Sequence, residues 1–274
     1  MDVSCESEPS RRICTLWIEG ELRLVDVVCL SSMVDKGMDV TLFVYGDVPN
    51  VPAGVNVMDG ESVLPLKMIE KLTPIHRKDR ILCQPVPLFS DLFRVKCQDL
   101  KCGLWLDSDV FLFRQFEYDI HEVYFAKENS YRIGSPVFYL PAKHPMCLDY
   151  MEFINKSPDL MPDWLGFRRG KLKPFFYDLL GIEYSAADLG LTIYGNDAFT
   201  RLAKRHDCYR LARPKPSFYY WNGKKTEYLF ESRDYRFFFD DPGHIGIHIH
   251  RKGRTTEPAV RNSFWEHALN LYGP

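Results

Sequence analysis

The sequence predicts an α/β fold in which helices cover a mixed, mostly parallel sheet. Residues 13–17 (ICTLW) have the apolar pattern of a buried strand, and residues 21–36 repeat apolar side chains at helical spacing. Residues 39–45 (DVTLFVY) are rich in β-branched and aromatic residues and predict a second strand. A strand, a helix and a strand within about 35 residues form a βαβ unit, which builds parallel sheets.

Further elements follow in order. Gly37 is placed to end the first helix in a left-handed conformation. Residues 55–58 predict another short strand, and residues 73–88, rich in proline and charge, predict a loop. Residues 88–101 have the spacing of a helix and lead through a glycine into an apolar strand at 104–106.

The rest of the chain predicts a strand at 136–140 and a helix over about 144–155. Basic, proline-rich stretches near 158–174 and 201–215 are expected to add C-terminal helices to the sheet. We expect residues 1–12 to be a flexible tail and residues 13–274 to form one domain, a size that buries a large core.

Composition excludes several classes of protein. The formal net charge of −2 argues against a nucleic-acid-binding protein, because such proteins neutralise phosphates with excess basic residues. No apolar run approaches the roughly 18–20 residues of a membrane span. The chain begins with polar, acidic residues where a signal peptide would be basic and then apolar. We therefore expect a cytoplasmic protein.

Two carboxylates directly after the 104–106 strand are the strongest candidates for chemistry. Asp107 and Asp109 stand at alternate positions, so an extended backbone would point both the same way. They lie at the carboxyl end of a strand, where open α/β sheets bind ligands. Converging carboxylates repel one another unless a cation is present, and their hard oxygen atoms suit Mg²⁺ or Mn²⁺. Without a cation they would be two solvated side chains in a loop.

The preceding helix carries Asp91 and Arg94, three residues apart on one face, which alone would be a surface ion pair of little energy. The order Ser-Asp-x-x-Arg, helix, glycine, strand and D-x-D over residues 89–113 resembles the glycosyltransferases with a D-x-D sugar-binding region. This family includes α-1,6-mannosyltransferases, α-1,4-galactosyltransferases, small bacterial polysaccharide glycosyltransferases and, more distantly, clostridial glucosylating toxins. A Gly-Gly pair is usual before the strand, where this chain has Cys102-Gly103.

Residues 16–55 also resemble the start of the small bacterial members, which begin with a W-x-G strand. The resemblance implies a GT-A-type, Rossmann-like domain, a nucleotide-sugar donor (most often a UDP sugar), a divalent metal and retention of anomeric configuration. It assigns nucleotide-sugar binding to residues 13–113. Residues 114–274 would supply the acceptor half and a C-terminal segment for metal and diphosphate.

The resemblance also implies roles for individual residues. Trp17 would lie near the nucleotide base, and Asp91 would bind ribose or sugar hydroxyl groups. Arg94 would touch the donor sugar and steady the carboxylates. Asp107 would contact the ribose or a metal-bound water, and Asp109 would bind the metal directly.

The segment GHIGIHIHRKGR is the main C-terminal candidate. In an extended stretch His244, His248 and His250 share one face, beside several basic residues. The apolar-His-apolar pattern at 247–249 resembles the end of small bacterial members, which favours His248 as metal or diphosphate ligand. His250 and Asn196 remain alternatives for the third metal ligand. A strand with exposed histidines and a basic edge, or a separate zinc site, would also fit the pattern.

Two weaker candidates remain. The loop at 194–200 resembles a family loop that borders the donor sugar, with Asn196 or Asp197 as the contact, although a helix N-cap explains the same residues. The second candidate is an acceptor face, or only a solvated basic loop, which would consist of Trp164, Arg168, Arg169 and Lys171.

Together these features predict a metal-dependent, retaining hexosyltransferase that uses a nucleotide sugar and a glycan or lipid-linked glycan acceptor. We expect a role in surface polysaccharide synthesis, such as lipopolysaccharide, with peripheral contact between the basic C-terminal half and the inner face of the membrane. One alternative is a haloacid-dehalogenase-like phosphatase with Asp107 as nucleophile and Asp240 and Asp241 as its second acid pair. Others are a protein-glycosylating effector and a non-catalytic binding module.

Overall fold

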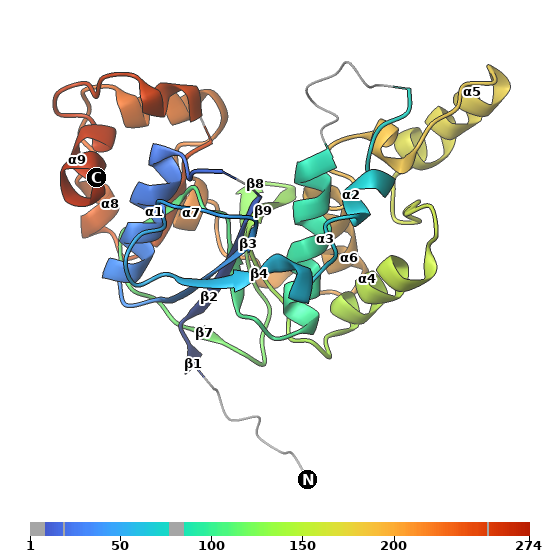
Figure 1. Cartoon of the computed structure of the whole chain (residues 1–274), viewed down its shortest axis with the longest axis horizontal. Helices are drawn as coiled ribbons and strands as arrows, with labels where there is room; N and C mark the ends of the chain where they lie inside the picture. Colours follow the sequence, from blue (N-terminus) through green and yellow to red (C-terminus); the bar gives the residue numbers. More distant parts are fainter. Residues whose placement is uncertain (1–8, 19, 77–84, 251) are drawn as a thin grey trace, which may run out of the picture.

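The computed structural model describes residues 9–18, 20–76, 85–250 and 252–274. Its centre is a six-stranded sheet in the order β4-β3-β2-β5-β9-β8 (Figure 1). The strands are β2 (Arg12–Ile18), β3 (Asp39–Tyr45), β4 (Asn56–Asp59), β5 (Leu104–Leu106), β8 (Tyr124–Asn129) and β9 (Arg132–Tyr139). Strands β4, β3, β2 and β5 run parallel, β9 is antiparallel to β5, and β8 is antiparallel to β9.

Helices cover both faces of this sheet (Figure 1). One side carries α1 with the C-terminal helices α8 and α9, and the other carries α3, α4 and α6. The helices are α1 (Leu24–Asp35), α2 (Met68–Lys71), α3 (Pro85–Asp99), α4 (Pro145–Lys156), α5 (Lys173–Leu179), α6 (Asn196–Arg205), α7 (Pro216–Tyr219), α8 (Phe237–Asp240) and α9 (Phe264–Tyr272). This is the predicted Rossmann-like α/β architecture, a mixed and mostly parallel sheet with added C-terminal helices.

Alternation along the central strands explains why both faces are buried. In β2, Ile13 packs with the residues of α1 and Cys14 packs with those of α3, and both side chains are fully buried. On the α3 side, the Phe93 ring lies 5.5 Å from Phe43 and 6.1 Å from Trp105 between centroids. Strand β5, the strand that precedes the acid pair, is therefore held rigidly by packing on both faces.

Two short two-stranded sheets are separate from the central sheet. Strand β1 (Pro9–Ser10) pairs with β7 (Tyr118–Asp119), and β10 (Gly246–His248) pairs antiparallel with β6 (Val110–Leu112). The prediction of a tail over 1–12 was therefore wrong for residues 9–12, which are held by backbone pairing; residues 1–8 lie outside the described part of the chain.

The other predicted elements correspond closely to those observed, with a further error at the start of α3. Among the described residues helix α3 covers Pro85–Asp99, so the end of the expected loop at 73–88 is helical; residues 77–84 of that loop lie outside the described part of the chain. Proline is tolerated in the first turn of a helix, where its missing N–H would have no partner. The prolines at 85 and 87 were read as loop signals although they stand at a helix start. Within the described ranges, no helix has the combination of length and apolarity needed to cross a membrane.

Candidate functional site

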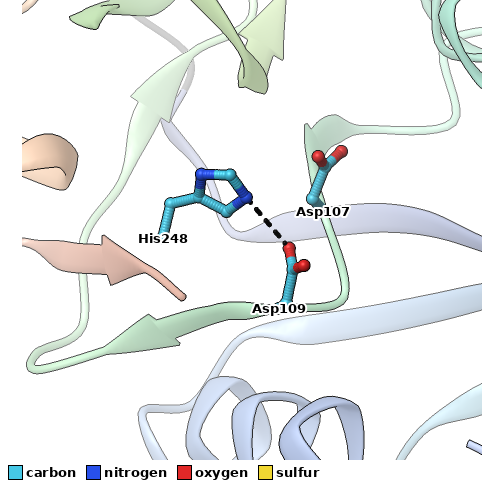
Figure 2. Close-up of side chains that lie close together, drawn as sticks. All are labelled: Asp107, Asp109 and His248. Carbon is cyan, nitrogen blue, oxygen red and sulfur yellow. Dashed lines mark ion pairs between the residues drawn. The ribbon is translucent and has the colours of Figure 1, made fainter. Parts of the chain in front are cut away.

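The acid pair lies in a turn that joins β5 to β6. The amide of Val110 donates to the Asp107 carbonyl at 3.0 Å, so the backbone turns where the sequence pattern suggested an extended strand. The two side chains nevertheless converge. Ligand atoms of Asp107, Asp109 and His248 all lie within 4.8 Å of one another (Figure 2).

His248 reaches this point through the β6–β10 ladder. The register pairs His248 with Val110, and the amide of Ile249 donates to the Asp109 carbonyl at 2.9 Å. Figure 2 shows the imidazole turned toward Asp109, with its Nε2 atom 3.2 Å from Oδ1 of that residue. The Asp109 side chain is only 4% exposed, whereas that of Asp107 is 26% exposed.

The other histidines of the C-terminal segment do not join this cluster. His244 lies outside β10, buried with its ring 5.4 Å from Phe238, so the expected shared face of three histidines was wrong. A β-strand of three residues is too short to align it with His248. The His250 ring lies 5.5 Å from that of His248 and near the Thr226 hydroxyl.

The basic residues Arg251, Lys252 and Arg254 follow these histidines in the chain. Arg251 lies outside the described residues. Arg254 pairs with Glu227 at 3.3 Å and with Glu257 at 2.5 Å. Its charge is therefore matched by glutamates and is not directed to a diphosphate.

A cavity of about 450 Å³ opens beside the acid pair, a size suited to a small-molecule ligand. It brings together six residues singled out in the sequence: Trp17, Asp91, Arg94, Asp107, Asp109 and Asn196. Asn196 lies on the cavity wall, where its amide donates to Glu128 and its carbonyl oxygen accepts from Ser135, both at 3.0 Å. Asn196 is not one of the three clustered ligands.

Arg94 connects the acidic groups of the cavity. Its guanidinium lies 3.3 Å from the carboxylate of Asp91 and 3.3 Å from that of Asp107, and its side chain is 5% exposed. It also stacks over the Trp105 ring at 4.8 Å and donates to the Ser90 hydroxyl at 3.1 Å. Buried ion pairs of this kind fix geometry, because removing one partner leaves an uncompensated charge.

Asp91 is a buried acid of the site. Burial raises its pKa to about 7, although the neighbouring Arg94 opposes this by favouring the charged form. Its carboxylate packs against Gly195, where any Cβ would collide with it. The glycine before α6 is therefore required by the close approach of Asp91.

Several residues of the site have no motif in the sequence. Trp105 donates its indole N–H to Asp107 at 2.6 Å, and the Ser108 hydroxyl donates to Asp26 at 2.6 Å. Arg23 holds Asp26 from the start of α1 with contacts of 2.5 and 2.7 Å. The polar nitrogen of a buried tryptophan requires an acceptor, which was the one available signal for Trp105.

Tyr219 is a further residue that the sequence did not indicate. It is 2% exposed, its hydroxyl has no hydrogen-bond partner among the described residues, and its ring lies 6.1 Å from that of His248. Burial raises its pKa well above the usual value, and the negative charges of Asp107 and Glu128 add to this. A buried hydroxyl without a partner, next to three clustered ligands, fits a site that holds an additional polar group.

The donor set fits a divalent cation. Two carboxylates and one imidazole that converge beside the cavity suit Mn²⁺ or Mg²⁺, and the imidazole favours Mn²⁺ of the two. Asp109 and His248 are the more buried ligands and would fix the ion. Asp107 is oriented by Trp105 and Arg94, so its carboxylate is also held in place.

No protein-family model and no curated protein matches the chain. Among solved structures, the chain is similar to PaToxG Glycosyltransferase with 12% sequence identity and a TM-score of 0.37, over 75% of this chain and 89% of that one. At this level the similarity bears neither on residue roles nor on activity.

Proposed function

We propose that this protein is a metal-dependent glycosyltransferase that uses a nucleotide-sugar donor. The observation that carries the proposal is the convergence of Asp107, Asp109 and His248 beside a cavity lined by Trp17, Asp91, Arg94 and Asn196. A cation site next to a cavity with acidic, basic and aromatic groups suits a ligand with a diphosphate, hydroxyl groups and a flat base.

Each part of the site then has a role. A divalent cation, when bound, neutralises charge on the diphosphate leaving group. Trp17 packs against the nucleotide base, and Asp91 accepts hydrogen bonds from ribose or sugar hydroxyl groups. Arg94 contacts the donor sugar and keeps Asp91 and Asp107 in place.

We further propose that the anomeric configuration is retained through displacement on one face of the sugar. The oxygen of the acceptor hydroxyl bonds to the anomeric carbon while the bond from that carbon to the diphosphate breaks. The hydroxyl proton passes to the departing diphosphate. Asn196, fixed by Glu128 and Ser135, would contact the sugar at the cavity wall.

The donor proposed is a UDP-hexose, and the acceptor a glycan or lipid-linked glycan in surface polysaccharide synthesis, such as lipopolysaccharide. The enzyme would work in the cytoplasm with peripheral contact at the inner face of the membrane. Residues 13–113 would bind the donor, and residues 114–274 would supply the acceptor side together with His248.

The phosphatase alternative requires a second acid pair at the metal. Asp240 and Asp241, the candidates for that pair, do not belong to the Asp107–Asp109–His248 cluster found among the described residues. Asp240 ends α8, and the carbonyl of Asp241 accepts from Arg114, which follows the end of β6. The geometry therefore favours the transferase.

Thermal unfolding with UDP, GDP or ADP, each with and without Mn²⁺, tests the proposal. A ligand at 100 times its dissociation constant stabilises by about 2.7 kcal/mol. For a chain of this size, that is a shift of about 5–10 °C. We expect a shift with UDP that requires Mn²⁺. A shift with GDP alone would change the donor, and no shift with any nucleotide would overturn the proposal.

A further inference from the structure

Residues 167–180, here called the α5 arm, project from the body of the molecule (Figure 1). The arm consists of a π-helical turn (Arg168–Leu172) followed by α5, with one flanking residue at each end. Its apolar side chains are unusually exposed: Phe167 74%, Phe175 58%, Phe176 49%, Leu179 66% and Leu180 67%. A contiguous exposed apolar surface on a soluble fold marks a site of interaction.

The opposite side of the arm is anchored, so this exposure is built into the fold. Tyr177 is buried, with its ring 5.3 Å from His76 and 4.9 Å from Tyr184. Just after the arm, Asp188 accepts the backbone amides of Ile75 at 2.9 Å and Ser185 at 2.8 Å. One side of α5 is therefore attached to the rest of the protein, and the leucine and phenylalanine side chains of the arm remain exposed.

The charge of the arm indicates the chemistry of its partner. It contains four basic residues and one acidic residue, in a chain whose formal net charge is −2. Arg168 and Lys171 are exposed, and neither has an acidic partner among the described residues, whereas Arg169 is paired with Asp197. Exposed aromatic and aliphatic side chains flanked by cations are the combination that binds the surface of an anionic bilayer.

The arm also borders the proposed active site. A second cavity, of about 690 Å³, is lined on one side by the arm through Arg168, Lys173 and Phe176. Its other side includes Leu191 and Thr192, which also line the cavity beside the acid pair. A bilayer that covers the arm would therefore lie close to residues that line the proposed donor cavity.

We propose that the α5 arm is the membrane-binding surface, with Phe175 and Leu179 inserted among the acyl chains of an anionic phospholipid bilayer and Arg168 and Lys171 at the headgroups. This inference rests on the proposed membrane location and names the surface responsible for it. Binding to vesicles is measured without donor or acceptor. If the protein does not bind vesicles, this inference fails and the transferase proposal stands. If the protein binds vesicles but is inactive, the transferase proposal fails and this inference stands.

Co-sedimentation of the full chain with vesicles tests this inference. Vesicles of phosphatidylcholine with about 30% phosphatidylglycerol are compared with pure phosphatidylcholine, at low salt and at about 0.5 M salt. We expect binding to the anionic vesicles alone, weakened by high salt. The double variant Phe175→Ser with Leu179→Ser should lose at least fivefold in affinity.

Two further double variants make the test specific. Arg168→Glu with Lys171→Glu should lower affinity by about fivefold or more per cation replaced. The matched control, Tyr131→Ser with Leu148→Ser, removes equally exposed apolar side chains, 67% and 53% exposed, elsewhere on the surface and should bind as wild type. All these positions are exposed, so unchanged thermal unfolding verifies that the variants fold.

Three outcomes would overturn the inference. Wild-type protein that ignores anionic vesicles at low salt is the first, and α5-arm variants that bind as tightly as wild type are the second. The third is that a second copy of the chain, and not a bilayer, covers the arm. If sedimentation velocity shows a dimer that the Phe175 and Leu179 substitutions dissociate, the arm is a protein interface.

Discussion

The Nε2 atom of His248 lies 3.2 Å from Oδ1 of Asp109, although the two residues are far apart in the chain, Asp109 in the turn before β6 and His248 at the end of β10. The antiparallel register of β6 and β10 alone sets this contact, because it places His248 opposite Val110. Side chains alternate faces along a strand, so a slip of one residue would turn the imidazole away from the acid pair. The register of β6 and β10 thus determines that His248 is the third member of the cluster.

Asp109→Asn should abolish the Mn²⁺-dependent stabilisation by UDP while leaving the fold intact. The amide keeps the shape of the side chain but removes the negative charge that a divalent cation needs. Thermal unfolding with UDP and Mn²⁺ is the measurement, and Asp47→Asn, an exposed carboxylate away from the cavity, is the control. Retention of most of the shift in Asp109→Asn would show that the metal assignment is wrong.

His248→Gln should weaken Mn²⁺ binding by about tenfold or more, since even the loss of an outer hydrogen-bond partner at a metal site has such an effect. His250→Gln is the matched control, because its ring lies 5.5 Å from that of His248 but outside the three-ligand cluster. Isothermal titration with Mn²⁺ compares the two. Equal losses in both variants would contradict the assignment of His248 as the ligand.

The fold was predicted well where hydrophobic pattern and element type coincide. Strands β3 and β5 have the predicted bounds, because β-branched and apolar runs of that length are buried on both faces of the sheet. The start of α3 was missed, because proline is common both in loops and in the first turn of a helix. Local pattern alone does not distinguish these two uses.

The site was predictable only in part. The acid pair, Asp91 and Arg94 follow one another closely in the chain, so their spacing carried information. Trp105 as a donor to Asp107 follows from how the strand packs, and spacing does not reveal it. The wrong alignment of His244 has a similar cause, since the length of β10 depends on where β6 ends.

Asp91 should make stability depend on pH. Its pKa is raised from 3.8 in a free carboxyl group to about 7 by burial, so the folded state holds a proton that the unfolded chain releases. The contribution of this group to stability is complete below about pH 3.8 and is lost as the pH rises to about 7. Asp91→Asn does not titrate and should not show this loss.

We therefore expect the free energy of unfolding of Asp91→Asn, relative to wild type, to rise between pH 4 and pH 7 and to level off above it. The rise should be on the order of a few kcal/mol at most. Urea denaturation at several pH values measures it for both proteins. A difference between the two that stays constant with pH would show that Asp91 is charged throughout, with Arg94 outweighing its burial.

Tyr219→Phe should separate stability from ligand binding. A buried hydroxyl without a partner costs about 1–3 kcal/mol, so its removal should leave the free energy of unfolding unchanged or raise it by about 1 kcal/mol. If the hydroxyl instead donates to a group of the bound metal–nucleotide complex, the same substitution should weaken UDP binding with Mn²⁺ several-fold.

Tyr124→Phe is the control, because its hydroxyl is also buried and unpartnered, but its one charged neighbour of note is Arg213. Titration of UDP with Mn²⁺, together with urea denaturation, measures both effects. Equal UDP affinity in wild type and Tyr219→Phe would remove Tyr219 from the binding site, because a hydroxyl that meets no ligand has no other means of changing affinity at that position.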